Sequence, residues 1–135
     1  MPDKSPAQSN RPRGMELMRD PLLNKGTGFS AAERDALGLR GLLPPVIATQ
    51  DQQANRIMHN LRKLADPLDK YVALNALHDR NEALYFRVVI DHIDEIMPII
   101  YTPTVGLACQ RYGEVFQRPR GMERASISWS VSKTA

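Results

Sequence analysis

The segment from Thr49 to Leu64 limits most strongly what this chain can fold into. Thr49 is followed three residues later by Gln52, a capping box of the kind that begins a helix. Behind it, apolar side chains recur at intervals of three and four residues, which places them on one helix face. These apolar residues are Ala54, Ile57, Met58, Leu61 and Leu64. The sequence therefore predicts an amphipathic helix over residues 50–65.

A similar start signal lies upstream. Ser30 and Glu33 form a second capping box, and Gly38 stands where a helix would stop. This pattern predicts a short helix over residues 30–37. The stretch before it, "MELMRDPLLNKGTGFS", holds one proline and two glycines and predicts irregular structure.

Further helices are predicted downstream. Pro67 suits a first helical turn. A broad apolar stripe over residues 80–96 predicts a long helix that Pro98 ends. Thr104 is then expected to cap a last helix through about residue 117. No convincing run of alternating residues predicts a strand, so the predicted fold class is all-α.

The bulk properties exclude several classes. At 135 residues, one domain is the expectation. The net charge of +3 is mild and the basic residues are scattered among acids, so neither nucleic acid nor a membrane is an expected partner. No apolar run approaches the length of a membrane span. One cysteine, Cys109, excludes an internal disulfide and fits a reducing, cytoplasmic location.

Most candidate cofactor motifs have a simpler explanation. Gly26 to Ala31 match the dinucleotide pattern G-x-G-x-x-A, but "DPLLNK" before them is a poor strand, so a loop entering a helix is favoured. The three histidines are isolated, and no His or Cys pair has zinc-ligand spacing. Asp91, Asp94 and Glu95 share a charged helix and are interpreted as a solvated face. Cys109 is expected to point inward.

Tyr101, Arg56 and Arg80 leave alternatives open. Tyr101 lies between the apolar "MPII" and a Thr-Pro-Thr turn that would hold it rigidly. A rigid phenol can act as an acid, but the pattern alone favours a buried structural tyrosine. Guanidinium groups suit carboxylate recognition, yet surface ion pairs are the favoured reading of both arginines.

The chain resembles the N-terminal region of malic enzymes from Arg13 to Gly121. The resemblance is carried by "DPLLNKGTGFS", "ERDALGLRGLLPP", "KYVALNALHDRNEALYFR" and "MPIIYTPTVGLACQRYG". It implies a helical N-terminal domain without the Rossmann-type NAD-binding domain. It also implies oxidative decarboxylation of L-malate to pyruvate and CO2, with NAD or NADP, Mg2+ or Mn2+, and a homo-oligomer, dimer or tetramer.

The resemblance also implies roles for particular residues. Tyr101 matches the family's general acid, which delivers a proton to enolpyruvate with help from a lysine of a later segment. Arg56 and Arg80 match two arginines of a fumarate site at the dimer interface. The glutamate of that site is replaced by Ala48 here, which argues against fumarate activation but leaves a dimer contact open.

By the same resemblance, the cofactor-binding and metal-binding residues are expected on later segments, with none in this chain. We therefore expect the isolated chain to be inactive. The alternative is an inactive fragment that acts only as a subunit-interaction, or dimerisation, module.

Three regions are expected: a disordered tail over residues 1–14, an incomplete malic enzyme N-terminal domain over 15–121, and a divergent, disordered tail over 122–135. The resemblance breaks after Met122, where the family continues into an apolar strand and this chain is rich in serine. A frameshift, a premature stop or a misplaced gene end is our hypothesis for that break, and the downstream nucleotide sequence decides it.

Overall fold

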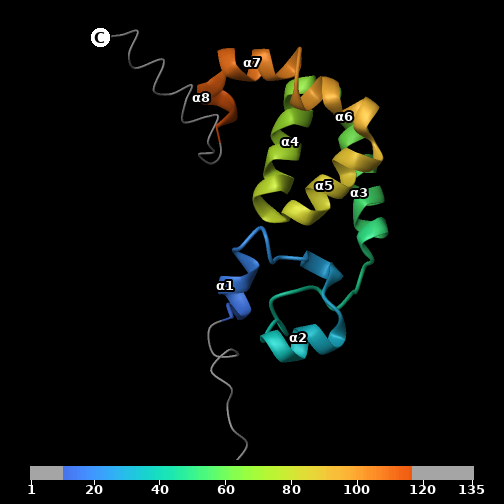
Figure 1. The fold of residues 1–135 in the computed structure, drawn as a ribbon, viewed down its shortest axis with the longest axis vertical. Coiled ribbons are helices and arrows are strands. Elements are labelled where there is room, and N and C mark those ends of the chain that lie inside the picture. Colours follow the sequence, from blue (N-terminus) through green and yellow to red (C-terminus); the bar gives the residue numbers. More distant parts are fainter. Residues whose placement is uncertain (1–10, 117–135) are drawn as a thin grey trace, which may run out of the picture.

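The computed structural model describes residues 11–116, which form helices and turns without a strand (Figure 1). The all-α prediction is therefore confirmed. No helix in this described part is long and apolar enough to cross a membrane. The elements are α1 (Gly14–Met18), the 3-10 helix η2 (Gly26–Gly28), α2 (Ala31–Leu37), α3 (Gln50–Lys63), α4 (Pro67–Arg80), α5 (Glu82–Asp91), α6 (Ile93–Ile100), α7 (Thr104–Gln110) and α8 (Tyr112–Val115).

Helix α2 begins and ends where its signals predict. The Ser30 hydroxyl accepts the Glu33 backbone N–H (3.2 Å), and the Ser30 N–H donates to the Glu33 carboxylate (2.9 Å). Gly38 closes the helix with φ of 68°, a left-handed conformation that costs glycine least. Local hydrogen bonding thus fixes both ends of this short helix.

Helices α3 and α4 also match their predictions. Thr49 and Gln52 form the second capping box, and α3 runs to Lys63. Pro67 is the first residue of α4, and the Asp66 carboxylate accepts the Leu68 backbone N–H (2.9 Å). Because proline needs no hydrogen-bond partner in the first turn, it costs nothing there.

The predicted long helix over residues 80–96 is wrong. The chain leaves α4 at Asn81, whose buried side chain accepts the Leu84 N–H (3.1 Å) and so starts α5. It breaks again at His92, which has φ of −129°. Pro98 lies inside α6 instead of ending it, and the helix closes when the Tyr101 N–H donates to the Met97 carbonyl (2.9 Å).

The last predicted helix is also divided. Thr104 is the first residue of α7 rather than its cap, since Pro103 holds the cap position without a side-chain hydrogen bond. The helix then breaks at Arg111 before α8. The segment expected to be irregular, residues 15–30, instead contains η2 (Gly26–Gly28) and all of α1 (Gly14–Met18) except its first residue.

The main core lies between α3, α4, α5 and α6. Helix α4 packs on α5, α6 and α7, while α3 packs on α5. Burial of these side chains removes apolar surface from water and holds the four helices together. The buried members are Ala54, Met58, Leu61, Leu74, Leu77, Leu84, Val88, Val89, Ile96 and Ile99.

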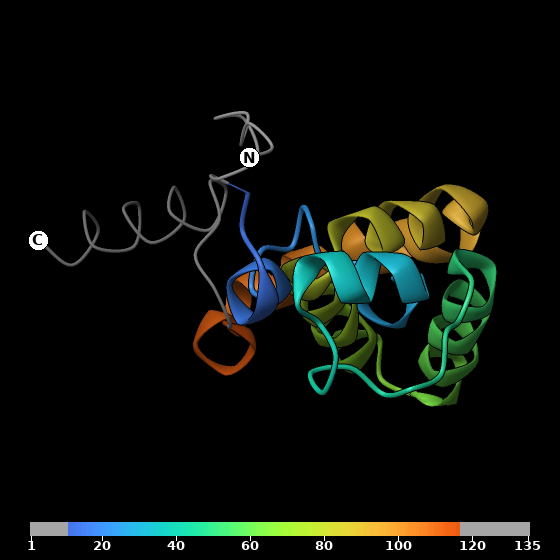
Figure 2. The same ribbon diagram turned by 90° about the horizontal axis from the view of Figure 1, so that it is seen from below.

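A separate N-terminal unit, residues 14–48, covers one end of this bundle. It has its own small core of Leu17, Phe29 and Leu39. The unit lies below the bundle in Figure 1 and in front of it in the view from below in Figure 2. A pocket lies where the two parts meet.

The expected tails extend beyond what the structure describes. Residues 1–10 of the N-terminal tail and the whole of 122–135 lie outside the described residues. Residues 11–13 precede α1, which begins at Gly14, the last residue of the expected N-terminal tail. The proposed boundaries of the three regions stay predictions.

We predict that Glu33→Gln lowers stability at neutral pH and has little effect in acid. The Lys25 ammonium, which donates to Glu33 at 2.6 Å, lowers the pKa of this carboxyl, and the Ser30 N–H lowers it further. A carboxyl whose pKa is lowered on folding stabilises the folded protein at pH values above its unfolded pKa, which is near 4.5. This stabilisation is lost as the pH falls through the folded pKa. Because the pair is exposed, the effect should stay below about 1 kcal/mol.

Thermal melts of both proteins across the acid range measure this difference. Glu16→Gln on α1 is the control, since the exposed Glu16 has no ion pair within residues 11–116. An equal loss at neutral and strongly acid pH would contradict the prediction.

Candidate functional site

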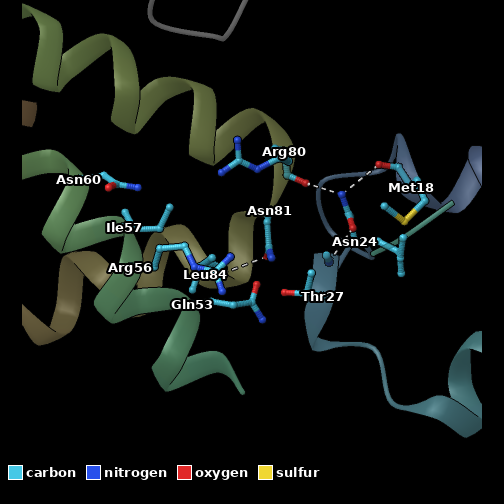
Figure 3. Close-up of a pocket in the computed structure, with 12 residues that line it drawn as sticks. Met18, Asn24, Thr27, Gln53, Arg56, Ile57, Asn60, Arg80, Asn81 and Leu84 are labelled. Atoms are coloured by element: carbon cyan, nitrogen blue, oxygen red, sulfur yellow. Dashed lines mark hydrogen bonds between the residues drawn. The ribbon is translucent and has the colours of Figure 1, made fainter. Parts of the chain in front are cut away.

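A pocket of about 430 Å3 lies between the N-terminal unit, α3 and the α4–α5 junction (Figure 3). The amphipathic pattern of α3 buries its apolar side and leaves polar side chains facing this junction. Arg80 ends α4, and its side chain extends toward α3. The lining residues are Met18, Asn24, Gly26, Thr27, Leu43, Gln53, Arg56, Ile57, Asn60, Arg80, Asn81 and Leu84.

The charge of the pocket is positive. Its lining contains Arg56 and Arg80 and no carboxylate. Neither guanidinium forms an ion pair with any carboxylate within residues 11–116, so the favoured reading of surface ion pairs is wrong for the part that the structure describes. Two guanidinium groups that line one hollow with amide neighbours suit a small anion.

Asn24 holds the pocket together, a role that few features of the sequence indicate. It is 5% exposed. Its amide donates to the carbonyls of Met18 (3.1 Å) and Arg80 (3.2 Å), and its oxygen accepts the Gly26 N–H (2.8 Å). The local bond to Gly26 is a turn motif that asparagine favours. The bond to Arg80 spans 56 residues and has no local signal.

Ala48, the position of the family's glutamate, lies beside the pocket wall. Its side chain is buried. Its N–H donates to the Thr27 carbonyl (3.0 Å), and its carbonyl accepts the Gln53 amide (3.3 Å). Ala48 thus joins two lining residues through its backbone and adds no negative charge.

Tyr101 is exposed, with 63% of its surface open to solvent. The reading of a buried structural tyrosine is therefore wrong. Its backbone is fixed on both sides, because its N–H donates to Met97 and its carbonyl accepts the Val105 N–H (2.6 Å). The α6–α7 junction that carries it lies at the end of the bundle opposite the N-terminal unit (Figure 1). The structure therefore brings the two arginines together and keeps Tyr101 apart.

The described residues do not fit a metal ion. Within residues 11–116, no three His, Cys, Asp or Glu side chains are grouped so as to hold one. Asp91 and Glu95 are exposed and pair with Arg87 (2.5 Å) and Arg62 (2.8 Å), which agrees with a solvated face. Cys109, expected to point inward, is exposed.

The glycine pair near residue 26 does not fit a dinucleotide either. Gly26–Gly28 forms a 3-10 helix that leads into α2, and no strand lies in the described residues before it, 11–25. A phosphate-binding fingerprint depends on a strand before the turn. The segment leads into α2 as interpreted, although residues 26–28 form a 3-10 helix rather than a loop.

Comparison with known proteins finds that the chain is similar to malic enzymes. Residues 78–128 match the family model for the malic enzyme, N-terminal domain. The chain is 53% identical over 121 residues to the mitochondrial NAD-dependent malic enzyme of Ascaris suum, which covers 90% of this chain and 19% of that protein. It is 53% identical over 109 residues to NADP-dependent malic enzyme 2 of Arabidopsis thaliana, covering 81% and 18%. The chloroplastic NADP-dependent malic enzyme of rice (Oryza sativa subsp. japonica) is 52% identical, covering 81% and 17%. The chain thus spans about a fifth of the length of these relatives.

We predict that Asn24→Asp destabilises the fold by about 1–3 kcal/mol. A carboxylate would face the Met18 and Arg80 carbonyls, which now accept hydrogen bonds from the amide. Chemical denaturation measures the loss. Asn55→Asp adds the same charge at an exposed position of α3 and should change stability by less than about 0.5 kcal/mol. Equal effects of the two substitutions would show that the Asn24 amide does not hold the Met18 and Arg80 segments together.

Proposed function

Because this chain is related to the malic enzymes over their N-terminal domain, we propose that it works as the N-terminal part of an NAD(P)-dependent malic enzyme. Such an enzyme converts L-malate to pyruvate and CO2. The observation that carries the proposal is the identity of about half of all residues over 90% of the chain, through the segment that holds Tyr101. The solvent-exposed phenol at a helix junction supports the chemical role.

We assign one chemical step to this chain. Once the alcohol of malate has been oxidised to a ketone, loss of CO2 leaves the electrons of the broken C–C bond in an enolpyruvate, and its carbon must then receive a proton. The Tyr101 O–H donates that proton as general acid. Its backbone hydrogen bonds to Met97 and Val105 fix the point at which the side chain leaves the helix, and a fixed starting point supports a role in general acid catalysis.

The remaining chemistry belongs to groups that the described residues do not fit. NAD or NADP and Mg2+ or Mn2+ would supply hydride acceptance and polarisation of the substrate. No metal-ligand group and no dinucleotide turn is present within residues 11–116. We therefore propose no step through them here, and we expect the 135-residue chain alone to oxidise no malate.

A chimeric enzyme tests the role of Tyr101. This chain would replace the matching segment of the Ascaris suum malic enzyme, which supplies the rest of the protein. The chimera should oxidise malate, and Tyr101→Phe should lower kcat by a factor on the order of 10² to 10⁴, the usual contribution of a general acid. Reduced nucleotide formation measures the rate.

Tyr71→Phe in the same chimera is the control, because Tyr71 packs against the cores and should tolerate the loss of its hydroxyl. A Tyr101→Phe chimera with unchanged kcat would overturn the role of the phenol. A folded but inactive chimera would count against the chain as a malic enzyme N-terminal part. The isolated chain, assayed beside it, tests the expected inactivity.

The pocket between Arg56 and Arg80 favours a second role, binding of a small dicarboxylate such as fumarate. Its lining holds two guanidinium groups that form no ion pair within residues 11–116, and it holds no carboxylate. Each charge-assisted hydrogen bond contributes about 1.5–3 kcal/mol, so each arginine should raise affinity by a factor on the order of ten to a hundred. Ala48 in place of the family's glutamate argues against activation, so we propose binding alone.

Calorimetric titration of the 135-residue chain with fumarate tests this binding. Arg56→Met and Arg80→Met should each weaken it at least about tenfold. Arg62→Met, on the same helix as Arg56 but outside the pocket and paired with Glu95, should leave it unchanged. Absence of binding in the unmodified chain, or equal binding in all three variants, would contradict the proposal.

The alternative of a dimerisation module, the oligomeric state and the cytoplasmic location all stay predictions. Exposed apolar side chains on α5 and α6 favour some protein contact. They are Phe86, Ile90, Ile93 and Met97.

A further inference from the structure

Arg34 on α2 is a buried charge that the proposed chemistry does not use. It is 2% exposed, and no carboxylate within residues 11–116 pairs with it. Its guanidinium instead donates to four backbone carbonyls: Phe29 (3.0 Å), Pro44 (2.6 Å), Thr27 (3.1 Å) and Val46 (2.9 Å). A buried charge is costly unless its hydrogen bonds are made.

These carbonyls belong to two segments, one on each side of α2 in the sequence. Residues 27–29 lead into α2, while residues 44–46 lead into α3. The planar guanidinium, with donors on three nitrogens, joins the two segments at a fixed spacing. The Ala48 N–H donates to the same Thr27 carbonyl and continues this link (3.0 Å).

The link ends in the wall of the anion pocket. Thr27 lines the pocket directly. Gln53 lines it from α3, and its amide donates to the Ala48 carbonyl (3.3 Å). Arg56 follows Gln53 by three residues, nearly one helical turn, so it lies on the same side of α3. The position of α3 relative to Thr27 therefore depends on what Arg34 holds.

We propose that Arg34 is a positioning residue for the anion pocket. It holds residues 27–29 against residues 44–46 and thereby sets the distance between Thr27 and the arginine-bearing face of α3. It does not touch the ligand. This inference rests on the proposed dicarboxylate binding, and it explains why an arginine is needed where lysine would keep the charge. Lysine has one nitrogen and cannot reach four carbonyls in a plane.

Arg34→Lys tests the proposal in the whole chain, with fumarate as the probe. The substitution keeps the positive charge but removes the planar guanidinium and its several donors. We therefore expect fumarate to bind at least about tenfold more weakly. Without ligand, amide exchange of Ala48 should be at least about tenfold faster, because its acceptor Thr27 is no longer held. Circular dichroism confirms that the variant is folded at the working temperature.

Two control variants separate positioning from loss of stability. Leu17→Ala weakens the same small core without touching the four carbonyls. It should lower the melting temperature yet keep the unmodified affinity for fumarate. Arg40→Met removes an exposed arginine that pairs with Asp35, and should change neither measurement. If Leu17→Ala at equal melting temperature weakens binding as much as Arg34→Lys does, the positioning role is refuted.

A measurement on the unmodified chain keeps the proposal testable if Arg34→Lys fails to fold. Saturating fumarate should slow hydrogen exchange of the Arg34 Nε–H and the Ala48 amide. The reason is that bound fumarate and the Arg34 hydrogen bonds favour the same arrangement of the two segments. Exchange that does not change on saturation would overturn the proposal. If the unmodified chain binds no fumarate, the proposed pocket fails. The rate of Ala48 amide exchange in Arg34→Lys then tests by itself whether Arg34 holds the two segments together. An unchanged rate would refute that role.

Discussion

The docking of the N-terminal unit onto the helical bundle is the contact on which the pocket depends. One buried amide, that of Asn24, joins the two parts by donating across 56 residues to the end of α4. The Glu82 N–H adds a second bond to the Pro21 carbonyl (2.9 Å). Both are ordinary neutral hydrogen bonds, each of modest net worth. Their value here is geometric, because they bring the helix that ends in Arg80 against the segment that contains Thr27.

The bundle separates two kinds of chemistry. At one end, a hollow lined by amides and two guanidinium groups suits an anion. At the other, a fixed turn presents a phenol to solvent. Helix α4 runs between these ends and packs on α5, α6 and α7. The proposed proton donor needs partners that the described residues do not supply, whereas the pocket proposed to bind an anion is lined wholly by described residues.

Local signals in the sequence predicted the starts of α2, α3 and α4 well. The capping boxes at Ser30 and Thr49 are short-range hydrogen-bond patterns, so residues three apart suffice to specify them. The break at His92 and the exposure of Tyr101 depend on how distant segments pack, which no local pattern encodes. The pocket shows the same limit. Both arginines were candidates from the sequence, but only the folded chain shows that they share a hollow.

The hydrogen bonds by which Asn24 shapes the pocket involve no charged group, whereas the anion that we propose there would be held by charge. Amide-to-carbonyl bonds in a buried setting respond little to ionic strength, while attraction between exposed guanidinium groups and an anion is screened within about 8 Å at physiological salt. The cavity should therefore persist across salt concentrations that empty it. If the pocket binds an anion as proposed, its occupancy would depend on anion concentration and ionic strength together, without a change in the shape of the protein.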